Sequence, residues 1–191
     1  MKANKGKGQL RIIAGQWRGR KLPIADLTGL RPSADRVRET LFNWLAPEIV
    51  GMRCLDLFAG SGALGLEALS RGAAHCQFVE QQGQAAGVLR QALVALGAGP
   101  RGEVQQEDAN KFLHRAGDEQ FDLLFLDPPF ASNLLDAVLE QLTDSPLLSE
   151  NALIYLEYAP GQNPITPVGW EQYRSKKSAG VIYELYRNKT P

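Results

Sequence analysis

The regular alternation of short apolar runs with longer amphipathic segments constrains the fold of this chain more than any other feature. Apolar runs occupy residues 54–58, 76–80, 122–127 and 152–158, a short strand is expected near residues 103–106, and helical patterns fill residues 63–71, 82–96, 109–116 and 132–142. Strands that are apolar along their whole length are typical of a parallel sheet that helices cover on both faces. The sequence therefore predicts an α/β protein with a mostly parallel, doubly wound sheet.

The C-terminal segment adds a different kind of strand to this sheet. Residues 170–177 and 181–187 are expected to form an antiparallel pair of strands joined at Ala179-Gly180. A glycine between two such strands is typical of a β-hairpin. We therefore expect an antiparallel C-terminal strand and a sheet of seven strands.

The N-terminal segment is predicted to form a small appendage of a β-hairpin and a helix. Residues 9–14 and 18–24 flank the turn, and Ser33 is expected to cap a helix over residues 34–45. One face of this helix is apolar, with Val37, Leu41, Phe42 and Leu45. We accordingly divide the chain into a basic arm with a hairpin, residues 1–33, and a ligand-binding domain, residues 34–191.

Charge is distributed unevenly along a chain whose formal net charge is zero. Residues 1–40 hold 10 Lys/Arg and 3 Asp/Glu, residues 41–170 hold 6 and 16, and residues 171–191 hold 5 and 2. A solvated tail is one interpretation, but the arm mixes cations with an aromatic ring, which suits phosphate neutralisation and base stacking. We expect these residues to contact a nucleic acid: Arg11, Trp17, Arg18, Arg20, Lys21 and Arg31.

Several classes of protein are excluded by composition. No apolar run reaches the length of a membrane helix, and the basic N-terminus lacks the apolar stretch of a signal peptide. Cys54 and Cys76 both lie in apolar runs, so we interpret them as buried free thiols. We expect a cytoplasmic monomer with no metal site.

A glycine-rich loop follows the first core strand, in the sequence Asp56-Leu-Phe58-Ala59-Gly60-Ser61-Gly62. Glycines let the backbone approach a ligand, and open α/β sheets bind ligands at the carboxyl ends of their strands. With Gly65, the spacing also fits the dinucleotide fingerprint. The loop alone therefore leaves open a nicotinamide cofactor, S-adenosylmethionine, or a tight turn that only serves packing. We assign these candidate cofactor residues: Asp56, Phe58, Ala59, Gly60, Ser61 and Gly62.

Acidic residues follow the next two strands. Glu80 ends residues 76–80, where a carboxylate can accept both ribose hydroxyls of an adenosine. Asp108 can accept from an adenine amine while the Ala109 N–H serves a ring nitrogen. Asp108 can equally cap the helix over residues 109–116, and the two roles are compatible.

The tetrapeptide Asp127-Pro128-Pro129-Phe130 ends the most apolar strand and decides between the cofactors. Proline cannot donate to a sheet ladder and fixes φ, so the strand stops and its carbonyl directions are set. A carboxylate and a rigid carbonyl are two acceptors for an exocyclic amine, and Phe130 offers a face for a planar base. A dehydrogenase needs no such group. We therefore assign the catalytic role to this tetrapeptide and also place Asp127 beside the cofactor.

These motifs together resemble a known family. The order DLFAGSG, VE, DA and DPPF is similar to Rossmann-like methyltransferases that act on amino groups. The segment Arg31 to Asn43 (RPSADRVRETLFN) and the segment Ile13 to Arg20 (IAGQWRGR, from residue 13) resemble the RsmD family of bacterial small-subunit ribosomal RNA guanine-N2 methyltransferases. A first glycine is common in methyltransferases where this chain has Phe58, and the RsmD group is similar in using Phe.

The resemblance implies S-adenosylmethionine as methyl donor and the N2 amine of a guanine in 16S ribosomal RNA as acceptor. It also implies a substrate within the small ribosomal subunit or an assembly intermediate. Helix 34–45 would then be a platform or lid in which Arg36 and Glu39 shape the cofactor and base pockets, and Arg36 and Arg38 would contact the RNA. A packing helix with a solvated polar face stays open.

Three other functions remain open at this point. An adenine-N6 or cytosine-N4 nucleic-acid methyltransferase would use the same tetrapeptide, because it serves any exocyclic amine. A nicotinamide-linked oxidoreductase would use the Gly60 loop but leaves Asp127 unexplained. A non-catalytic RNA-binding assembly factor could keep the fold without the reaction.

Overall fold

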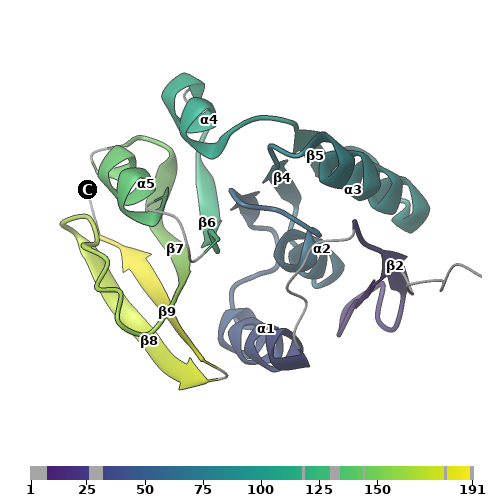
Figure 1. The fold of residues 1–191 in the computed structure, drawn as a ribbon, viewed down its shortest axis with the longest axis horizontal. Coiled ribbons are helices and arrows are strands. Elements are labelled where there is room, and N and C mark those ends of the chain that lie inside the picture. The colour runs from purple at the N-terminus through teal and green to yellow at the C-terminus, as the bar shows by residue number, and fades with distance from the viewer. Residues whose placement is uncertain are drawn as a thin grey trace, which may run out of the picture.

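The computed structural model describes residues 8–25, 32–117, 119–129, 134–143, 145–178 and 180–189, with the backbone alone for residues 32–34 (Figure 1). The helices are α1 (Pro32–Leu45), α2 (Ala63–Ser70), α3 (Gly83–Leu96), the 3-10 helix η1 (Gly99–Arg101), α4 (Ala109–Arg115) and α5 (Leu134–Leu142). The strands are β1 (Gln9–Arg11), β2 (Lys21–Pro23), β3 (Arg53–Asp56), β4 (His75–Val79), β5 (Gly102–Gln105), β6 (Phe121–Leu126), β7 (Leu148–Tyr158), β8 (Trp170–Ser178) and β9 (Val181–Asn188).

A seven-stranded sheet with the order β5-β4-β3-β6-β7-β9-β8 forms the centre of the molecule. The first five of these strands are parallel, and β9 runs antiparallel to both of its neighbours, β7 and β8. It follows that β8 runs in the same direction as β7. The predicted α/β class, the mostly parallel sheet and the antiparallel C-terminal strand are confirmed.

Helices cover both faces of the sheet, as its apolar strands require. Helices α1, α2 and α3 lie on one face and α4 and α5 on the other (Figure 1). Alternate strand residues divide between two hydrophobic cores: Cys54 and Phe125 face α1 and α2, whereas Leu55 and Leu124 face α4 and α5. No helix within the described ranges is long and apolar enough to cross a membrane.

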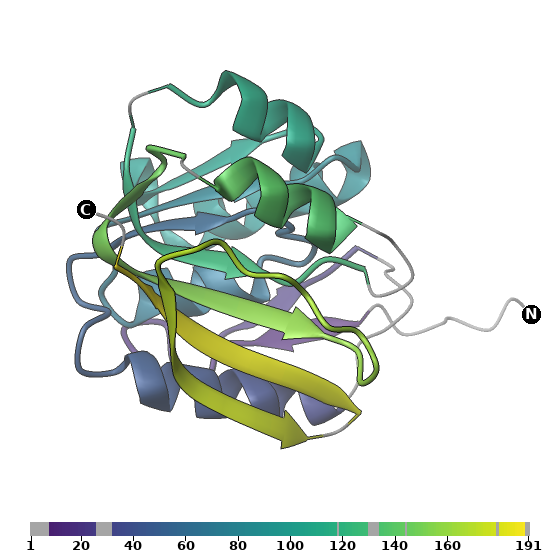
Figure 2. The same ribbon diagram turned by 90° about the vertical axis from the view of Figure 1, so that its left-hand side faces the viewer.

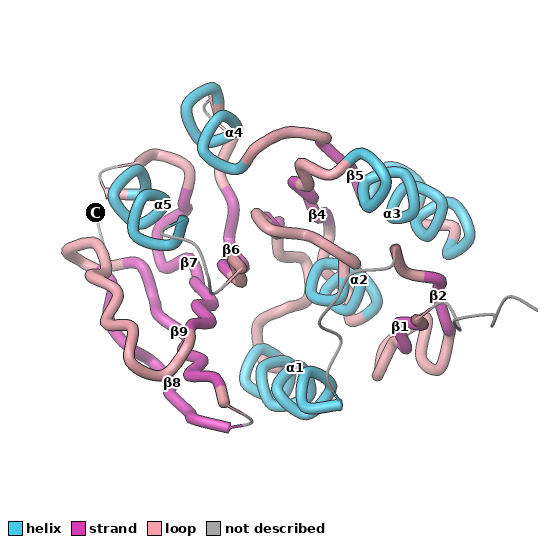
Figure 3. Tube along the Cα trace, in the orientation of Figure 1, coloured by secondary structure: helices cyan, strands magenta, loops and turns pink. Residues whose placement is uncertain are grey.

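The N-terminal hairpin pairs β1 with β2 and lies beside α2 and α3, on the face of the sheet that α1 also covers (Figure 3). Leu10, Ile12 and Leu22 are buried in the same hydrophobic core as α1, α2 and α3. The two segments that the sequence divides at residues 33 and 34 therefore share one core.

Helix α1 begins at Pro32, so the prediction that Ser33 caps it is wrong. Proline suits the first helical position because its φ is fixed near the helical value and because it has no N–H that would need a partner. The helix therefore starts two residues earlier than predicted, at Pro32 instead of residue 34. The predicted apolar face is confirmed, because Val37, Leu41 and Phe42 are all buried.

Candidate functional site

Four carboxyl groups lie along one edge of the sheet, which we call the carboxyl edge. The parallel strands β3, β4, β5, β6 and β7 all end there, and β8 ends there too because it runs with β7. Ligands of open α/β sheets bind outside such an edge. The four residues stand at or just after the ends of β3, β4, β5 and β6: Asp56, Glu80, Asp108 and Asp127.

The glycine-rich loop connects β3 to α2 at the carboxyl edge. Gly60 and Gly62 have φ of 52° and 76°, a left-handed conformation that glycine adopts without a steric penalty. The loop is fixed to the neighbouring strand by a hydrogen bond from Ala59 N to Val79 O of 3.0 Å. A Cβ on Gly65 would lie 2.2 Å from the ring of Phe78, so this glycine serves close helix–sheet packing.

Glu80 organises the loop with both of its carboxylate oxygens. Oε2 accepts from Gly60 N at 2.8 Å, and Oε1 accepts from Gln82 N at 2.7 Å. Each carboxylate oxygen has a second lone pair, so these bonds leave acceptor capacity for a ligand hydroxyl. Glu80 therefore has a structural role that the sequence did not reveal, beside the ribose-binding role assigned to it.

Asp56 is buried at the end of β3, and its Oδ2 accepts from Gly65 N at 3.0 Å. Burial raises the pKa of this carboxyl to about 7, the hydrogen bond from Gly65 lowers it in part, and the nearby Glu80 carboxylate raises it. Burial therefore favours the protonated form of the Asp56 carboxyl more than in an exposed aspartate.

Asp108 caps helix α4, as the sequence allowed. Its Oδ1 accepts from Asn110 N at 3.1 Å and from Lys111 N at 3.2 Å. Ala109, the first residue of the helix, is buried. The cap places the Asp108 carboxylate at the carboxyl edge next to the end of β5.

Asp127 follows the last residue of β6 and is exposed to solvent, while Pro128 is buried. The carboxyl group of Asp127 is nevertheless desolvated by the protein atoms around it. This desolvation, with the charges of Glu157 and Asp56, raises its pKa well above the usual range for an aspartate. Strand β6 ends at Leu126, just before the motif, as expected from the two prolines. Phe130 lies outside the described residues.

Two residues of β7 belong to the surroundings of Asp127, and the sequence analysis missed them. Leu126 pairs with Leu156, so Asp127 and Glu157 are the next residues on neighbouring strands. The hydroxyl of Tyr155 donates to Glu157 Oε2 at 2.6 Å. Burial raises the pKa of Glu157, and the Tyr155 hydrogen bond lowers it in part. A lone acidic residue within the apolar run ALIYLEY was the available signal.

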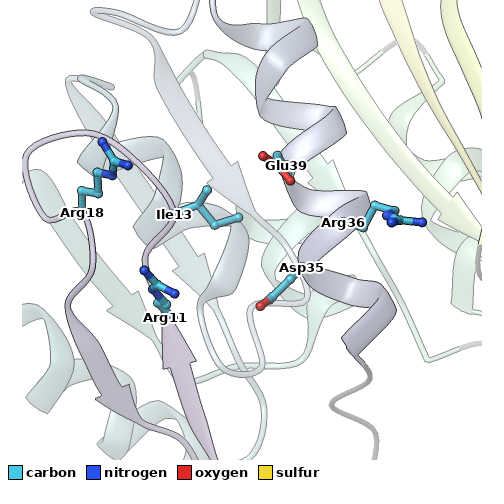
Figure 4. Close-up of a pocket in the computed structure, with 6 residues that line it drawn as sticks. All are labelled: Arg11, Ile13, Arg18, Asp35, Arg36 and Glu39. Atoms are coloured by element: carbon cyan, nitrogen blue, oxygen red, sulfur yellow. The ribbon is translucent and has the colours of Figure 1, made fainter.

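A cavity of about 390 Å³ lies between the hairpin and α1 (Figure 4). Arg11 and Arg18 reach it from the hairpin, and Asp35 and Glu39 from α1, whereas the guanidinium of Arg36 points away from the hairpin. Arg11, Arg18 and Arg36 are exposed. The structure therefore brings Arg11 and Arg18 together at the cavity, and Arg36 lines it from α1 with its guanidinium turned away (Figure 4).

Two of the predicted RNA contacts are corrected by their burial. The Trp17 side chain is 6% exposed and lies under the guanidinium of Arg101, 5.2 Å from its ring, so it packs within the protein. Arg38 is 4% exposed and donates to Arg11 O at 2.7 Å and to Asp35 Oδ1 at 3.1 Å, tying α1 to the hairpin. Burial lowers the pKa of Arg38, although Asp35 and Glu67 oppose this.

The remaining predicted contacts are divided. Lys21 and Arg20 are exposed on the hairpin, but one Arg20 nitrogen donates to Ala95 O at 2.9 Å. Arg31 lies outside the described residues. The sequence shows which residues are basic. It does not distinguish an exposed cation from one whose hydrogen bonds hold two elements of the fold together.

Glu67 of α2 is a further residue that the sequence analysis missed. It is fully buried and accepts from Ile13 N at 2.8 Å, from Ala14 N at 2.9 Å and from Arg71 Nε at 2.7 Å. Ser70 adds two bonds to the same turn, donating to Ala14 O and accepting from Trp17 N. The helix that starts at the glycine-rich loop therefore also holds the basic hairpin.

Cys54 and Cys76 are fully buried free thiols, as predicted, and burial raises the pKa of each. In the part of the chain that the structure describes, no group of three or more His, Cys, Asp or Glu side chains could hold a metal ion.

Comparison with known proteins shows that this chain is similar to ribosomal RNA methyltransferases over almost its whole length. The model of a family described as "Conserved hypothetical protein 95" matches residues 10–187. "Ribosomal RNA small subunit methyltransferase D" of Escherichia coli K12 is 49% identical over 183 residues, which cover 95% of this chain and 91% of that protein. The protein of the same name from Haemophilus influenzae is 46% identical over 184 residues, 95% of each chain.

Solved structures share the fold. That of yhhF from Escherichia coli superposes with a TM-score of 0.87 at 47% identity and covers 96% of this chain and 100% of that chain. SMU.776, solved as a complex with SAH, has a TM-score of 0.67 at 17% identity and covers 98% of this chain and 58% of that chain. At that identity the likeness concerns the fold alone.

Proposed function

The chain belongs to the RsmD family of small-subunit ribosomal RNA methyltransferases, and from that premise we propose that it transfers a methyl group from S-adenosylmethionine to the exocyclic N2 amine of a guanine in 16S ribosomal RNA. The observation that carries the proposal is the position of Asp127, an exposed residue at the end of β6, beside β3, the strand that leads into the glycine-rich loop. The substrate would be the small subunit or an assembly intermediate, which places the enzyme in the cytoplasm.

The residues of the carboxyl edge fit S-adenosylmethionine. Glu80 has acceptor capacity for ribose hydroxyls, and the glycine-rich loop presents backbone without side chains at Gly60 and Gly62. Asp108 and Ala109, next along the edge, would hold the adenine. Phe58, Ala59, Ser61 and Asp56 complete the same loop. A bound S-adenosylmethionine supplies an electrophilic methyl group on a positively charged sulfonium, for which the carboxyl groups of Asp56 and Asp127 are suitable neighbours.

The chain's own contribution to the reaction is to position the acceptor amine. An exocyclic amine delocalises its lone pair into the ring and is a poor nucleophile. The Asp127 carboxylate and the Pro128 carbonyl would each accept one amine hydrogen, which favours a pyramidal nitrogen whose lone pair points at the methyl group. Phe130 would stack on the base, and Pro129 would hold the turn. Positioning and electrostatics of this kind supply most of the rate enhancement in such sites.

The proton lost by the methylated nitrogen needs an acceptor at the same place. The Asp127 carboxylate would be placed to take up this proton, and its raised pKa favours proton uptake. Glu157, which receives the hydrogen bond of Tyr155, lies on the next strand and adds negative charge. Asp127 is therefore the acceptor of both the hydrogen bond and the proton.

The exposed cations of the hairpin and α1 would bind the RNA backbone. Arg11, Arg18, Arg20, Lys21 and Arg36 neutralise phosphates, and binding should weaken steeply with salt. The target base has to leave its stack to reach the carboxyl edge, which favours a guanine in a loop or bulge.

Nucleoside analysis tests the proposal. Small subunits from cells that lack this enzyme are incubated with the protein and methyl-labelled S-adenosylmethionine, and their RNA is digested for mass spectrometry. The proposal predicts N2-methylguanosine. Methylated adenosine or cytidine would mean that the acceptor is the exocyclic amine of another base. Binding of S-adenosylmethionine without any methyl transfer would mean that the protein is a non-catalytic assembly factor.

A further inference from the structure

The edge strand β8 carries a basic surface that has no part in the site described above. Seven consecutive residues of β8, from 171 to 177, are exposed, and they include Arg174, Lys176 and Lys177. None of these three takes part in an ion pair among the described residues. The same stretch holds one carboxylate, Glu171, so the surface is net positive on a chain whose residues 41–170 are strongly acidic.

The position of this charge links it to the reaction. Strand β8 runs parallel to β6 and β7, so Lys176 and Lys177 near its end lie toward the carboxyl edge, the edge that holds Asp127. Helix α1 packs beside β8, and its first turns carry the exposed Arg36, whose guanidinium points away from the hairpin (Figures 2 and 4). The β8 surface and the hairpin thus place positive charge on opposite sides of helix α1 (Figure 1).

An aromatic side chain accompanies the cations. The pairing of β8 with β9 shifts register between Gln172 and Arg174, so Tyr173 is the extra residue of a bulge. Bulges re-aim side chains. Tyr173 as a residue is 38% exposed, and the guanidinium groups of Arg174 and Arg187 lie 4.1 Å and 5.1 Å from the centroid of its ring. Exposed aromatic rings between cations are typical of surfaces that bind single-stranded RNA.

We propose that the exposed edge of the sheet along β8 is a second binding surface for the ribosomal RNA substrate, with Tyr173, with Arg174 and Lys176 on the sheet face that α1 covers, and with Lys177 on the opposite face. The inference rests on the proposed function, because the RNA is the partner that this site would methylate. Lysines on an edge strand also prevent edge-to-edge aggregation. That role needs no aromatic ring and no particular edge, whereas these cations lie toward the reactive edge beside an exposed tyrosine.

The test compares two variants that each lose two positive charges. Lys176→Gln/Lys177→Gln removes charge from the β8 surface. Lys189→Gln/Arg90→Gln is the control, because Lys189 follows β9 at the opposite edge of the sheet and Arg90 is exposed on α3. The readouts are the KM for small subunits from cells that lack the enzyme, the kcat, the Kd for S-adenosylmethionine, and binding at several salt concentrations.

We expect the β8 variant to raise the KM about tenfold at moderate salt and to reduce the salt slope of binding by roughly 1.4 to 1.8, for two lost phosphate contacts. Its kcat and its affinity for S-adenosylmethionine should stay within about twofold of wild type. The control variant should match wild type in every readout, and protein-free ribosomal RNA at low salt should show the same difference between the variants.

Three results overturn the inference. A β8 variant that behaves like the control means that the lysines bind no substrate. A loss seen with subunits but not with protein-free RNA means that a ribosomal protein is the partner. A wild-type protein that does not methylate the subunits refutes the proposed function itself, and the RNA surface with it.

Discussion

Removal of the Glu67 carboxylate should release the N-terminal hairpin from helix α2. Glu67→Ala leaves the amides of Ile13 and Ala14 and the guanidinium of Arg71 without their buried acceptor. A hydrogen bond to a charged group contributes roughly 1.5–3 kcal/mol, and breaking one partner of a buried ion pair costs about 3–5 kcal/mol. The three bonds share one carboxylate and are not additive, so we expect a loss of about 3–5 kcal/mol in the free energy of unfolding.

Urea unfolding measures this loss, and hydrogen exchange locates it. The amides of Ile13 and Ala14 should exchange much faster in Glu67→Ala, and Glu67→Gln, which keeps one acceptor oxygen, should fall between it and wild type. Glu107→Ala is the control, because its partner Arg115 is half exposed, and such surface pairs contribute about 1 kcal/mol or less. A loss below about 1 kcal/mol for Glu67→Ala, with both amides as protected as in wild type, refutes the reasoning.

Two further predictions concern a turn and a buried acid. Gly15 and Gly19 have φ of 81° and 79°, but a Cβ would lie 1.8 Å from Ser70 O at Gly15 and would meet nothing within 4 Å at Gly19. Gly19→Ala should therefore cost about 1–2 kcal/mol of unfolding free energy and Gly15→Ala clearly more; equal losses in urea unfolding would count against the docked turn. The raised pKa of Asp56, from 3.8 to about 7, means that the folded state keeps a proton that the unfolded state releases between about pH 4 and 7, so stability falls as pH rises through this range. Asp56→Asn should flatten the decline, by up to about 4 kcal/mol at pH 8, and a decline as steep as that of wild type contradicts the pKa.

The sheet could be predicted from the sequence because its signals are local. Apolar runs, glycines and the prolines after Asp127 each determine where a strand stops, and the strands begin and end within a few residues of the predicted positions. The start of α1 was missed because a proline at the first helical position and a serine cap are alternative ways to begin a helix.

The candidate site could be predicted only in part, because its residues act in pairs that sequence does not connect. Glu80, Asp108 and Asp127 were predicted from their places after strands, and the structure places all three at the carboxyl edge. Glu67 and Glu157 were missed, since their partners lie 54 and 2 residues away and only folding shows which backbone amide or hydroxyl faces them. For the same reason Trp17 was assigned to RNA although it packs against Arg101.

The rate of methyl transfer in Asp127 variants tests the central claim most directly. Single-turnover transfer from labelled S-adenosylmethionine to small subunits should fall at least about 100-fold in Asp127→Ala, because an acceptor for the amine hydrogen is lost, while the Kd for S-adenosylmethionine changes less than about threefold. Asp127→Asn keeps an acceptor oxygen, so its transfer rate should lie between those of Asp127→Ala and wild type. Near-normal transfer by Asp127→Ala would contradict the account.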